Sequence, residues 1–156
     1  MAGLLVSCSS SDDTTASGGL PSSASDAVAT YANIVEATYQ DTAQTAGELD
    51  SAAQALVASP SQGTLDAART AWFASREPYL QSEVFRFYDG PIDNPDDGPE
   101  GMINAWPLDE AYIDYVEDAP ESGIVNDPAE TIDAETLMSL NEQGGEENIA
   151  TGYHAI

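Results

Sequence analysis

The sequence has very few basic residues. It contains three Lys and Arg residues in total against 28 Asp and Glu, which gives a formal net charge of −25 at pH 7. The three basic residues are Arg69, Arg76 and Arg86. Proteins bind nucleic acids and anionic lipid surfaces by placing clusters of Lys and Arg against the phosphates. The composition therefore excludes a nucleic-acid-binding protein and a protein that binds an anionic membrane surface through charge.

Cysteine, histidine and long apolar runs are also scarce. The chain has one cysteine, Cys8, so it cannot form an internal disulfide, and its one histidine is His154. No stretch approaches the roughly 18 apolar residues that a membrane-spanning helix needs. Hydrophobic residues nevertheless make up 42% of the sequence, which is enough for a packed core, so a wholly disordered chain is not expected.

The acidic residues are spread along the whole chain, and this distribution has two interpretations. They form either a solvated coat suited to high salt, where counterions screen the self-repulsion, or a surface that collects cations. The sequence favours the coat, because a collecting surface would concentrate its charges in one tract. A chain with such a coat should be less stable at low ionic strength.

The N-terminal residues predict a lipid anchor. Leu5-Val6-Ser7-Cys8 resembles the lipobox of bacterial lipoproteins, and polar residues follow it. Residues 1–8 would then be a signal remnant, with Cys8 lipidated and holding the protein to a membrane of the cell envelope. No Lys or Arg precedes Leu4, so the start is expected to be truncated or miscalled. The alternative for Cys8 is an ordinary buried or reactive thiol. Residues 9–24 are rich in Ser, Thr, Gly and Asp, which predicts a flexible tether.

The remaining chain carries helical patterns. Apolar residues recur at helical spacing from Ser25 to a predicted end at Ser59-Pro60, and Thr64 is the predicted cap of a second helix. That second helix should break or kink at Glu77-Pro78 and then continue for a turn or two as far as Phe87.

The second half of the chain predicts shorter helices. Residues 89–107 are dense in Asp, Gly, Pro and Asn and predict a long irregular loop. We expect further helices over Leu108–Glu117 and from an Asp133 cap through Asn141, and a last helix that opens at Glu146. No alternating β-branched run competes with this pattern. The predicted fold class is all-α, a helical bundle.

The sequence from residue 25 to residue 156 resembles the imelysin family. Its end, Gly152-Tyr153-His154, is similar to the start of the family motif Gly-x-His-x-x-Glu, whose glutamate would follow Ile156. The other segments that carry the resemblance are Ala71-Trp72, Arg76-Glu77-Pro78-Tyr79, Ser82-Glu83, Phe85-Arg86-Phe87, Asp89-Gly90-Pro91-Ile92-Asp93, Gly98-Pro99-Glu100-Gly101 and Asn104 to Val116.

The resemblance implies an all-helical protein of two bundle-like domains that is exported to the cell envelope and associated with iron acquisition. Residues 25–156 would form the N-terminal half, truncated at its C-terminus. Some family members are classed as metallopeptidases. An envelope location, facing the periplasm or the cell surface, agrees with the lipobox at Cys8.

The motif suggests metal binding by His154, and the alternative for this histidine is an ordinary surface or packed residue. A histidine and a glutamate three residues apart on a helix lie on one face, where an imidazole nitrogen and a carboxylate oxygen can share a cation such as iron or zinc. Two ligands are too few, so further oxygen ligands must come from elsewhere, and Glu77 and Glu83 are the candidates. The alternative for these carboxylates is ion pairing, of Glu77 with Arg76 and of Glu83 with Arg86.

Three functions follow as hypotheses. The first is an envelope lipoprotein that binds a transition metal, iron in the first place, and works with other envelope proteins of iron uptake. The second is a metal-dependent envelope peptidase, which ranks lower because the sequence lacks a His-Glu-x-x-His arrangement to activate water. The third is a non-catalytic module that binds a partner through its acidic helices.

Overall fold

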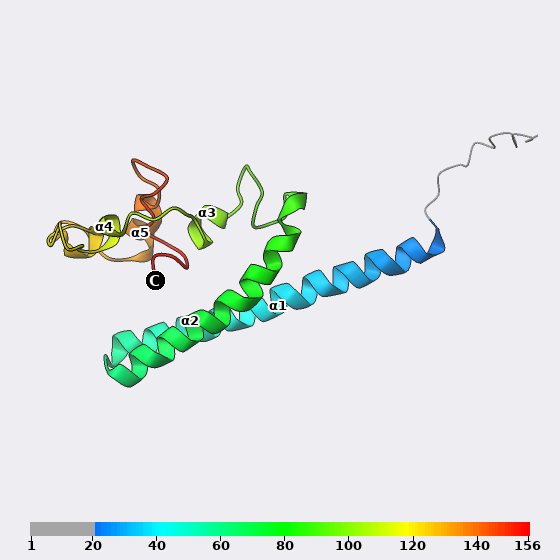
Figure 1. The fold of residues 1–156 in the computed structure, drawn as a ribbon, viewed down its shortest axis with the longest axis horizontal. Coiled ribbons are helices and arrows are strands. Elements are labelled where there is room, and N and C mark those ends of the chain that lie inside the picture. Colours follow the sequence, from blue (N-terminus) through cyan, green and yellow to red (C-terminus); the bar gives the residue numbers. More distant parts are fainter. Residues whose placement is uncertain (1–20) are drawn as a thin grey trace, which may run out of the picture. The chain divides into compact units, whose positions relative to one another are not determined.

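The computed structural model describes residues 21–156. Cys8 and residues 9–20 of the predicted tether lie outside the described residues, so the lipid anchor stays a prediction. The predicted end of the tether at residue 24 is wrong, since residues 22–24 are already helical. The described chain contains helices and no strand, and its one isolated β-bridge joins Val116 to Ala119 (Figure 1). The all-α prediction is confirmed. The elements in chain order are α1 (Ser22–Ala58), α2 (Gln62–Ser82), the 3-10 helix η1 (Glu83–Tyr88), α3 (Glu100–Ile103), α4 (Glu110–Ile113), the 3-10 helix η2 (Ile124–Asn126) and α5 (Ala134–Leu140).

The chain divides into two units, Met1–Ile34 and Val35–Ile156. The described part of the first unit is residues 21–34, which form the opening turns of α1 and expose Val28, Tyr31 and Ile34. The core and the candidate site belong to the second unit. Within residues 21–156, no helix is both long and apolar enough to cross a membrane.

Helix α1 begins three residues before the predicted start at Ser25 and ends where the sequence predicts. The amide of Ser59 still donates to the carbonyl of Ala55 at 3.0 Å. Pro60 has no N–H to continue this pattern, so the helix ends before it.

Helix α2 is capped by Ser61, so the prediction of Thr64 as the cap is wrong. The Ser61 hydroxyl accepts from the Thr64 amide at 3.2 Å, and the Thr64 hydroxyl accepts from the Ser61 amide at 3.0 Å. These reciprocal bonds form a capping box, in which Thr64 occupies the third helical position. The helix therefore begins earlier, at Gln62.

Pro78 lies inside α2 and does not break it. The helix continues to Ser82, and η1 extends the chain to Tyr88. A proline removes one backbone hydrogen bond and bends a helix without necessarily ending it. Tyr79 is 2% exposed and Phe85 packs against Tyr39 with ring centroids 6.0 Å apart, so contacts with α1 hold the turns after the proline.

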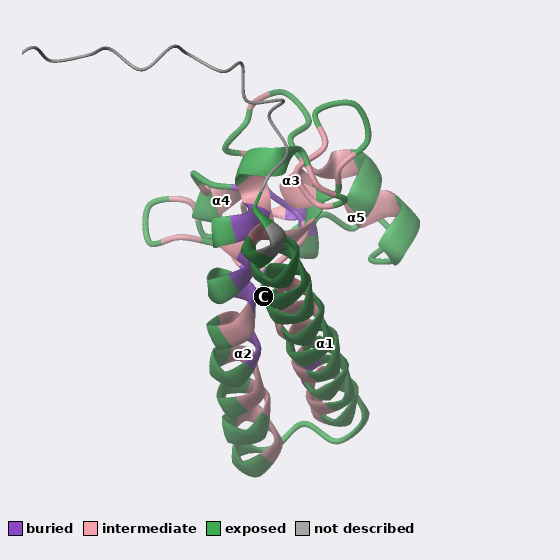
Figure 2. Ribbon diagram, turned by 90° about the vertical axis from the view of Figure 1, so that its right-hand side faces the viewer, coloured by how far each residue is buried: buried purple, intermediate pink, exposed green. Residues whose placement is uncertain are grey.

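The core of the second unit lies between the helical pair and the end of the chain. Helix α2 runs beside the part of α1 from residue 35 onward, and its buried residues face inward (Figure 2). Leu49 from α1, Tyr79 from α2 and Tyr153 from the terminal segment form the centre of the core. Ala71, Trp72 and Ile103 pack against them.

The segment after α2 is less helical than predicted. The loop over residues 89–107 contains one short helix, α3, and the predicted helix Leu108–Glu117 is reduced to α4 (Glu110–Ile113). Asp109 caps α4 by accepting from the Ala111 amide at 3.0 Å. The helix stops because Gly123 approaches the Asp114 backbone so closely that a Cβ there would lie 2.4 Å from the Asp114 nitrogen. The returning chain therefore occupies the space of the next turn.

Helix α5 confirms the prediction of a helix that is capped by Asp133 and ends at Asn141. Asp133 caps it by accepting from the Thr136 amide at 2.9 Å, and Asn141 follows its last residue. Hydrogen bonds from the backbone and then the side chain of Thr136 to the charged carboxylate lower the pKa of Asp133.

The prediction of a last helix that opens at Glu146 is wrong, since residues 141–156 form turns. The Glu142 amide donates to the carbonyl of Asn148 at 2.7 Å, and the Ala150 amide donates to the side chain of Asn141 at 2.9 Å. Backbone amides that a helix would pair with the carbonyl four residues earlier are bound instead by a side chain or by a carbonyl at a different spacing.

Candidate functional site

Tyr153 fixes the terminal segment against α2 and α3. Its amide donates to the Ile103 carbonyl at 2.8 Å, and its carbonyl accepts from Nε1 of Trp72 at 2.9 Å. Its buried hydroxyl lies 2.5 Å from Oγ of Ser75, which is fully buried. Because these bonds hold the backbone of Tyr153 on both sides, they also fix the position of the next residue, His154.

Gly152 allows this close approach. Its φ is +81°, a conformation that other residues rarely adopt, and a Cβ there would lie 2.4 Å from the Ile103 oxygen. The glycine of the Gly-Tyr-His sequence is thus required by backbone geometry. Asn141 holds the residues before it, since its Oδ1 accepts from the amides of Ala150 and Thr151 at 2.9 and 3.2 Å.

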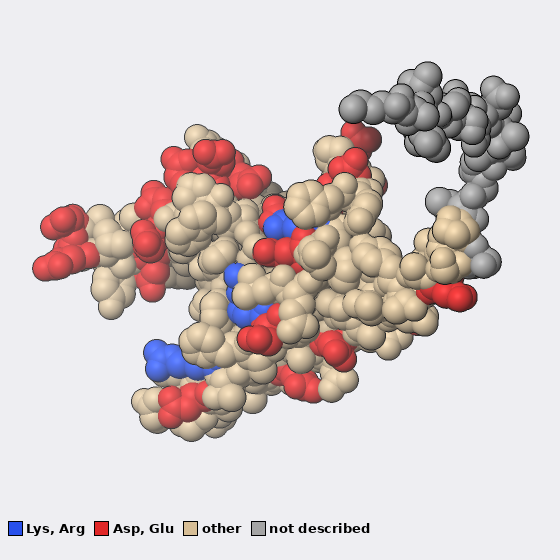
Figure 3. Space-filling view, turned by 45° about the vertical axis from the view of Figure 1, so that its right-hand side comes forward, with Lys and Arg blue, Asp and Glu red and all other residues tan. Residues whose placement is uncertain are grey.

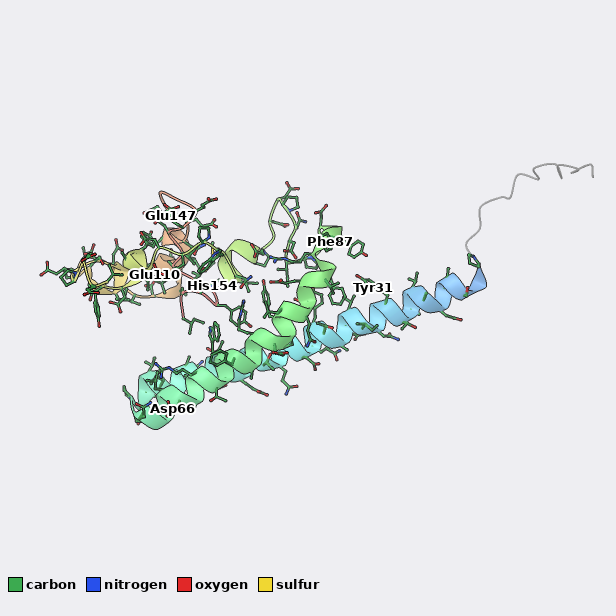
Figure 4. The ribbon with its side chains drawn as sticks, viewed as in Figure 1. Tyr31, Asp66, Phe87, Glu110, Glu147 and His154 are labelled. Carbon is green, nitrogen blue, oxygen red and sulfur yellow. The ribbon has the colours of Figure 1, made fainter. Side chains whose placement is uncertain are left out.

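The His154 side chain is half-buried beside Trp106, with ring centroids 4.9 Å apart. Figure 4 shows it on the terminal segment. Burial lowers the pKa of His154, the positive charge of Arg76 lowers it further, and the Glu100 carboxylate acts in the opposite direction. The neutral imidazole, which has a free lone pair for a metal, is therefore favoured.

An apolar hollow of about 660 Å³ opens beside His154. It lies between α1 and α2, and it is exposed at its edge, where Phe73 and Trp106 are 70% and 67% accessible. The apolar residues that line it include Leu49, Leu56, Leu65, Trp72, Phe73, Trp106 and Leu108.

Arg76 lies between the aromatic residues of the core. Its Cζ is 4.9 Å from the ring centroid of Tyr153, 5.7 Å from that of Trp72 and 5.8 Å from that of Tyr79. Its Nη1 donates to Oδ1 of Asn104. These cation–π contacts and the one hydrogen bond hold the guanidinium close to the His154 segment.

Arg86 is the centre of a separate, ion-paired cluster. Its guanidinium binds Asp93 and Glu100 at 2.5 Å each and Glu83 at 3.5 Å. Burial alone would lower the pKa of Arg86, but the hydrogen bonds to Asp93 and Glu100 raise it overall. The cluster ties η1 to the loop and to the start of α3.

The hydroxyl of Tyr79 is buried and has no hydrogen-bond partner within residues 21–156. Burial raises the pKa of Tyr79 to about 12, Arg86 acts to lower it, and the carboxylates of Glu100 and Asp93 add to the increase. The group therefore stays neutral under ordinary conditions.

The three predicted metal ligands do not meet in one place. Glu77 is exposed and lines a hollow that contains Asp41, whereas His154 lines the apolar hollow. Glu83 binds Arg86, as its alternative interpretation predicted. In the described part of the chain, no three His, Cys, Asp or Glu side chains are grouped so as to hold a metal ion. Metal ligation by these residues stays a prediction.

Sequence reasoning missed the residues that build the site around His154. No role beside His154 was predicted for Ser75, Asn104 or Asn141, and Arg76 was considered only as a partner of Glu77. For Ser75, Asn104 and Arg76 the one available signal was their position inside or beside the segments that carry the family resemblance, and Asn141 lies outside those segments. Their contacts join residues far apart in the chain, so no local pattern marks them.

The acidic side chains are dispersed over the surface. Figure 3 shows Asp and Glu at many separate places on the visible face and few basic residues. This distribution is the one expected of a solvated coat.

Two comparisons with known proteins bear on the chain. The family model described as imelysin matches residues 35–156. "Iron-regulated protein A" of Synechococcus elongatus is 36% identical over 76 residues, which are 49% of this chain and 20% of that protein. The matched part of the chain thus spans about a fifth of the length of that relative.

Proposed function

The chain belongs to the imelysin family, and from this premise we propose that it is a cell-envelope lipoprotein that binds a transition metal for iron acquisition, with His154 as a ligand. The printed name of the relative from Synechococcus elongatus, which calls that protein iron-regulated, supports the link to iron. Iron is the first candidate for the metal and zinc the second, since imidazole binds both.

The observation that carries this proposal is the fixed position of His154. The hydrogen bonds of Tyr153 to Ile103, Trp72 and Ser75 immobilise the backbone beside it. A ligand that is already held in place loses little entropy when it binds a metal. The lowered pKa keeps the imidazole neutral, so a metal would not compete with a proton near neutral pH.

Glu100 is a further candidate for an oxygen ligand. It is close enough to His154 to influence its pKa, and it lines a polar hollow together with Trp106, which contacts the imidazole. One of its oxygens binds Arg86, which leaves the other oxygen available. Glu83 shares the same arginine, whereas Glu77 lines another hollow.

Metal titration of four proteins tests this proposal. Equilibrium dialysis with zinc and with iron should show tight binding to the wild type, loss of binding in His154→Ala, and weaker binding in Glu100→Gln. Glu110→Gln is the matched control, because it removes one exposed carboxylate that is not a candidate ligand. Wild-type affinity in His154→Ala would contradict the proposal.

The lipid anchor is tested separately in cells. Cys8 should incorporate labelled fatty acid, and Cys8→Ser should move the protein from the membrane fraction to the released fraction. Unchanged fractionation of Cys8→Ser would contradict the anchor.

The two alternatives make different predictions. A peptidase requires hydrolysis of a peptide that a chelator stops, and an interaction module requires metal-independent partner binding that survives His154→Ala. The metal-binding proposal predicts neither result.

A further inference from the structure

Arg76 has no carboxylate partner within residues 21–156, although the chain contains 28 Asp and Glu residues. All three ion pairs found in the described part of the chain belong to Arg86. Arg76 is only partly exposed, and its one hydrogen bond to a side chain goes to the neutral amide of Asn104. A partly buried charge is costly unless an opposite charge accompanies it, so the guanidinium lacks the partner that its setting calls for.

The aromatic residues around Arg76 orient its guanidinium and leave its N–H donors available for a ligand. The rings of Trp72, Tyr79 and Tyr153 lie within 6 Å of its Cζ, and these contacts orient the guanidinium without using its N–H groups. A guanidinium has five N–H donors in one plane, and Asn104 accepts from one nitrogen. The remaining donors suit a planar carboxylate, which binds arginine through two parallel hydrogen bonds.

Arg76 also affects what can bind at His154. Its Cζ lies 4.9 Å from the ring centroid of Tyr153, the residue before His154, so its positive charge would repel a bare cation held by the imidazole. An anion bound to Arg76 would remove this repulsion. A metal chelated by a small carboxylic acid would place a cation beside His154 and an anion beside Arg76.

We propose that Arg76 and Asn104 form an anion-binding site for the carboxylate of a small metal-chelating acid, so that His154 receives the metal together with this acid. The role of the metal rests on the proposed function, whereas binding of the carboxylate does not. Asn104 positions the guanidinium, and the aromatic rings fix its plane.

The test uses oxalate as the probe and the full chain at constant ionic strength, because salt screens such contacts. Binding of metal-free oxalate is followed by the fluorescence of Trp72, which contacts Arg76, and by calorimetry. The wild type should bind oxalate saturably, and Arg76→Gln should weaken binding about tenfold or more. Arg69→Gln is the matched control: it removes an exposed arginine from the same helix and should change the affinity by less than about twofold.

A second variant keeps the test decisive if Arg76→Gln folds poorly. Asn104→Asp has nearly the same shape and places a carboxylate on Arg76 from within the chain. It should raise the melting temperature and abolish oxalate binding. Oxalate binding at wild-type strength in both Arg76→Gln and Asn104→Asp would overturn the site, and so would the absence of binding in the wild type.

Two further measurements test which class of anion binds at Arg76 and whether the metal binds together with it. A guanidinium also binds phosphate through two hydrogen bonds, so inorganic phosphate is the competing probe. The assignment to carboxylates predicts that oxalate binds more tightly, and equal or tighter binding of phosphate would overturn it. Zinc should increase the labelled oxalate that stays with the wild type on gel filtration, but not with His154→Ala. Oxalate binding at Arg76 without any metal binding would contradict the proposed function and support the anion site. Metal binding that oxalate leaves unchanged would overturn joint binding.

Discussion

The hydroxyl of Tyr153 lies 2.5 Å from Oγ of Ser75, a residue 78 positions earlier in the chain. Both side chains are buried, so neither oxygen has water as an alternative partner. This contact joins the residue before His154 to the middle of α2. The position of the candidate ligand therefore depends on the packing of the second unit as a whole.

Removing this hydroxyl should destabilise the protein. Tyr153→Phe leaves Oγ of Ser75 buried without its partner, and the free energy of unfolding should fall by about 1–3 kcal/mol. Urea denaturation measures the change. Tyr115→Phe is the control, because Tyr115 is 63% exposed and should change the stability by less than about 0.5 kcal/mol. An equal stability of Tyr153→Phe and wild type would show that the contact does not hold the segment.

The same change at Tyr79 should have the opposite effect. Its buried hydroxyl has no partner within residues 21–156, so Tyr79→Phe removes a desolvated polar group. The stability should stay the same or rise by about 1 kcal/mol. A loss as large as that of Tyr153→Phe would mean that the Tyr79 hydroxyl makes a bond that this account does not include.

Tyr79 also predicts the response to alkaline pH. Its pKa is about 12 in the folded chain against 10.0 for an ordinary tyrosine, because burial disfavours the phenolate. A raised folded pKa contributes stability that is complete below pH 10 and is lost as the pH rises to about 12. Wild type should therefore lose stability relative to Tyr79→Phe across this interval. Parallel stability curves for the two proteins would contradict the assignment.

Two glycines give contrasting predictions. Gly152→Ala places a Cβ 2.4 Å from the Ile103 oxygen, on a residue whose φ is +81°. We expect the free energy of unfolding to fall by about 1–3 kcal/mol or more. Gly47→Ala adds a methyl group to α1 with nothing within 4 Å, and should raise the stability by about 1 kcal/mol. Thermal melts of both variants measure the effects, and a neutral Gly152→Ala would be inconsistent with the described turn.

The acidic surface predicts that salt stabilises the protein. Adding NaCl should raise the melting temperature, because counterions screen the repulsion within a chain of net charge −25. Sucrose at equal osmolality is the control for general solute effects. A flat or falling melting temperature with NaCl would count against a solvated acidic coat.

Helices α1 and α5 were predictable because their signals are local. The periodic apolar residues of α1, Pro60 after it and the Asp133 cap of α5 act within a few residues of one another. The terminal segment was not predictable, since the side chain of Asn141 and the carbonyl of Ile103 bind backbone groups that a helix from Glu146 would otherwise pair. The surroundings of His154 were missed for the same reason: Ser75 and Tyr153 meet only through the folded chain.

The central claim is that His154 binds a transition metal, and X-ray absorption spectroscopy of the metal-loaded chain tests it most directly. The zinc-loaded wild type should show the scattering pattern of one imidazole, with a nitrogen at about 2.0–2.1 Å. His154 is the one histidine of the sequence, so this pattern must disappear in His154→Ala. A wild-type spectrum with oxygen ligands alone, unchanged in the variant, would contradict the account.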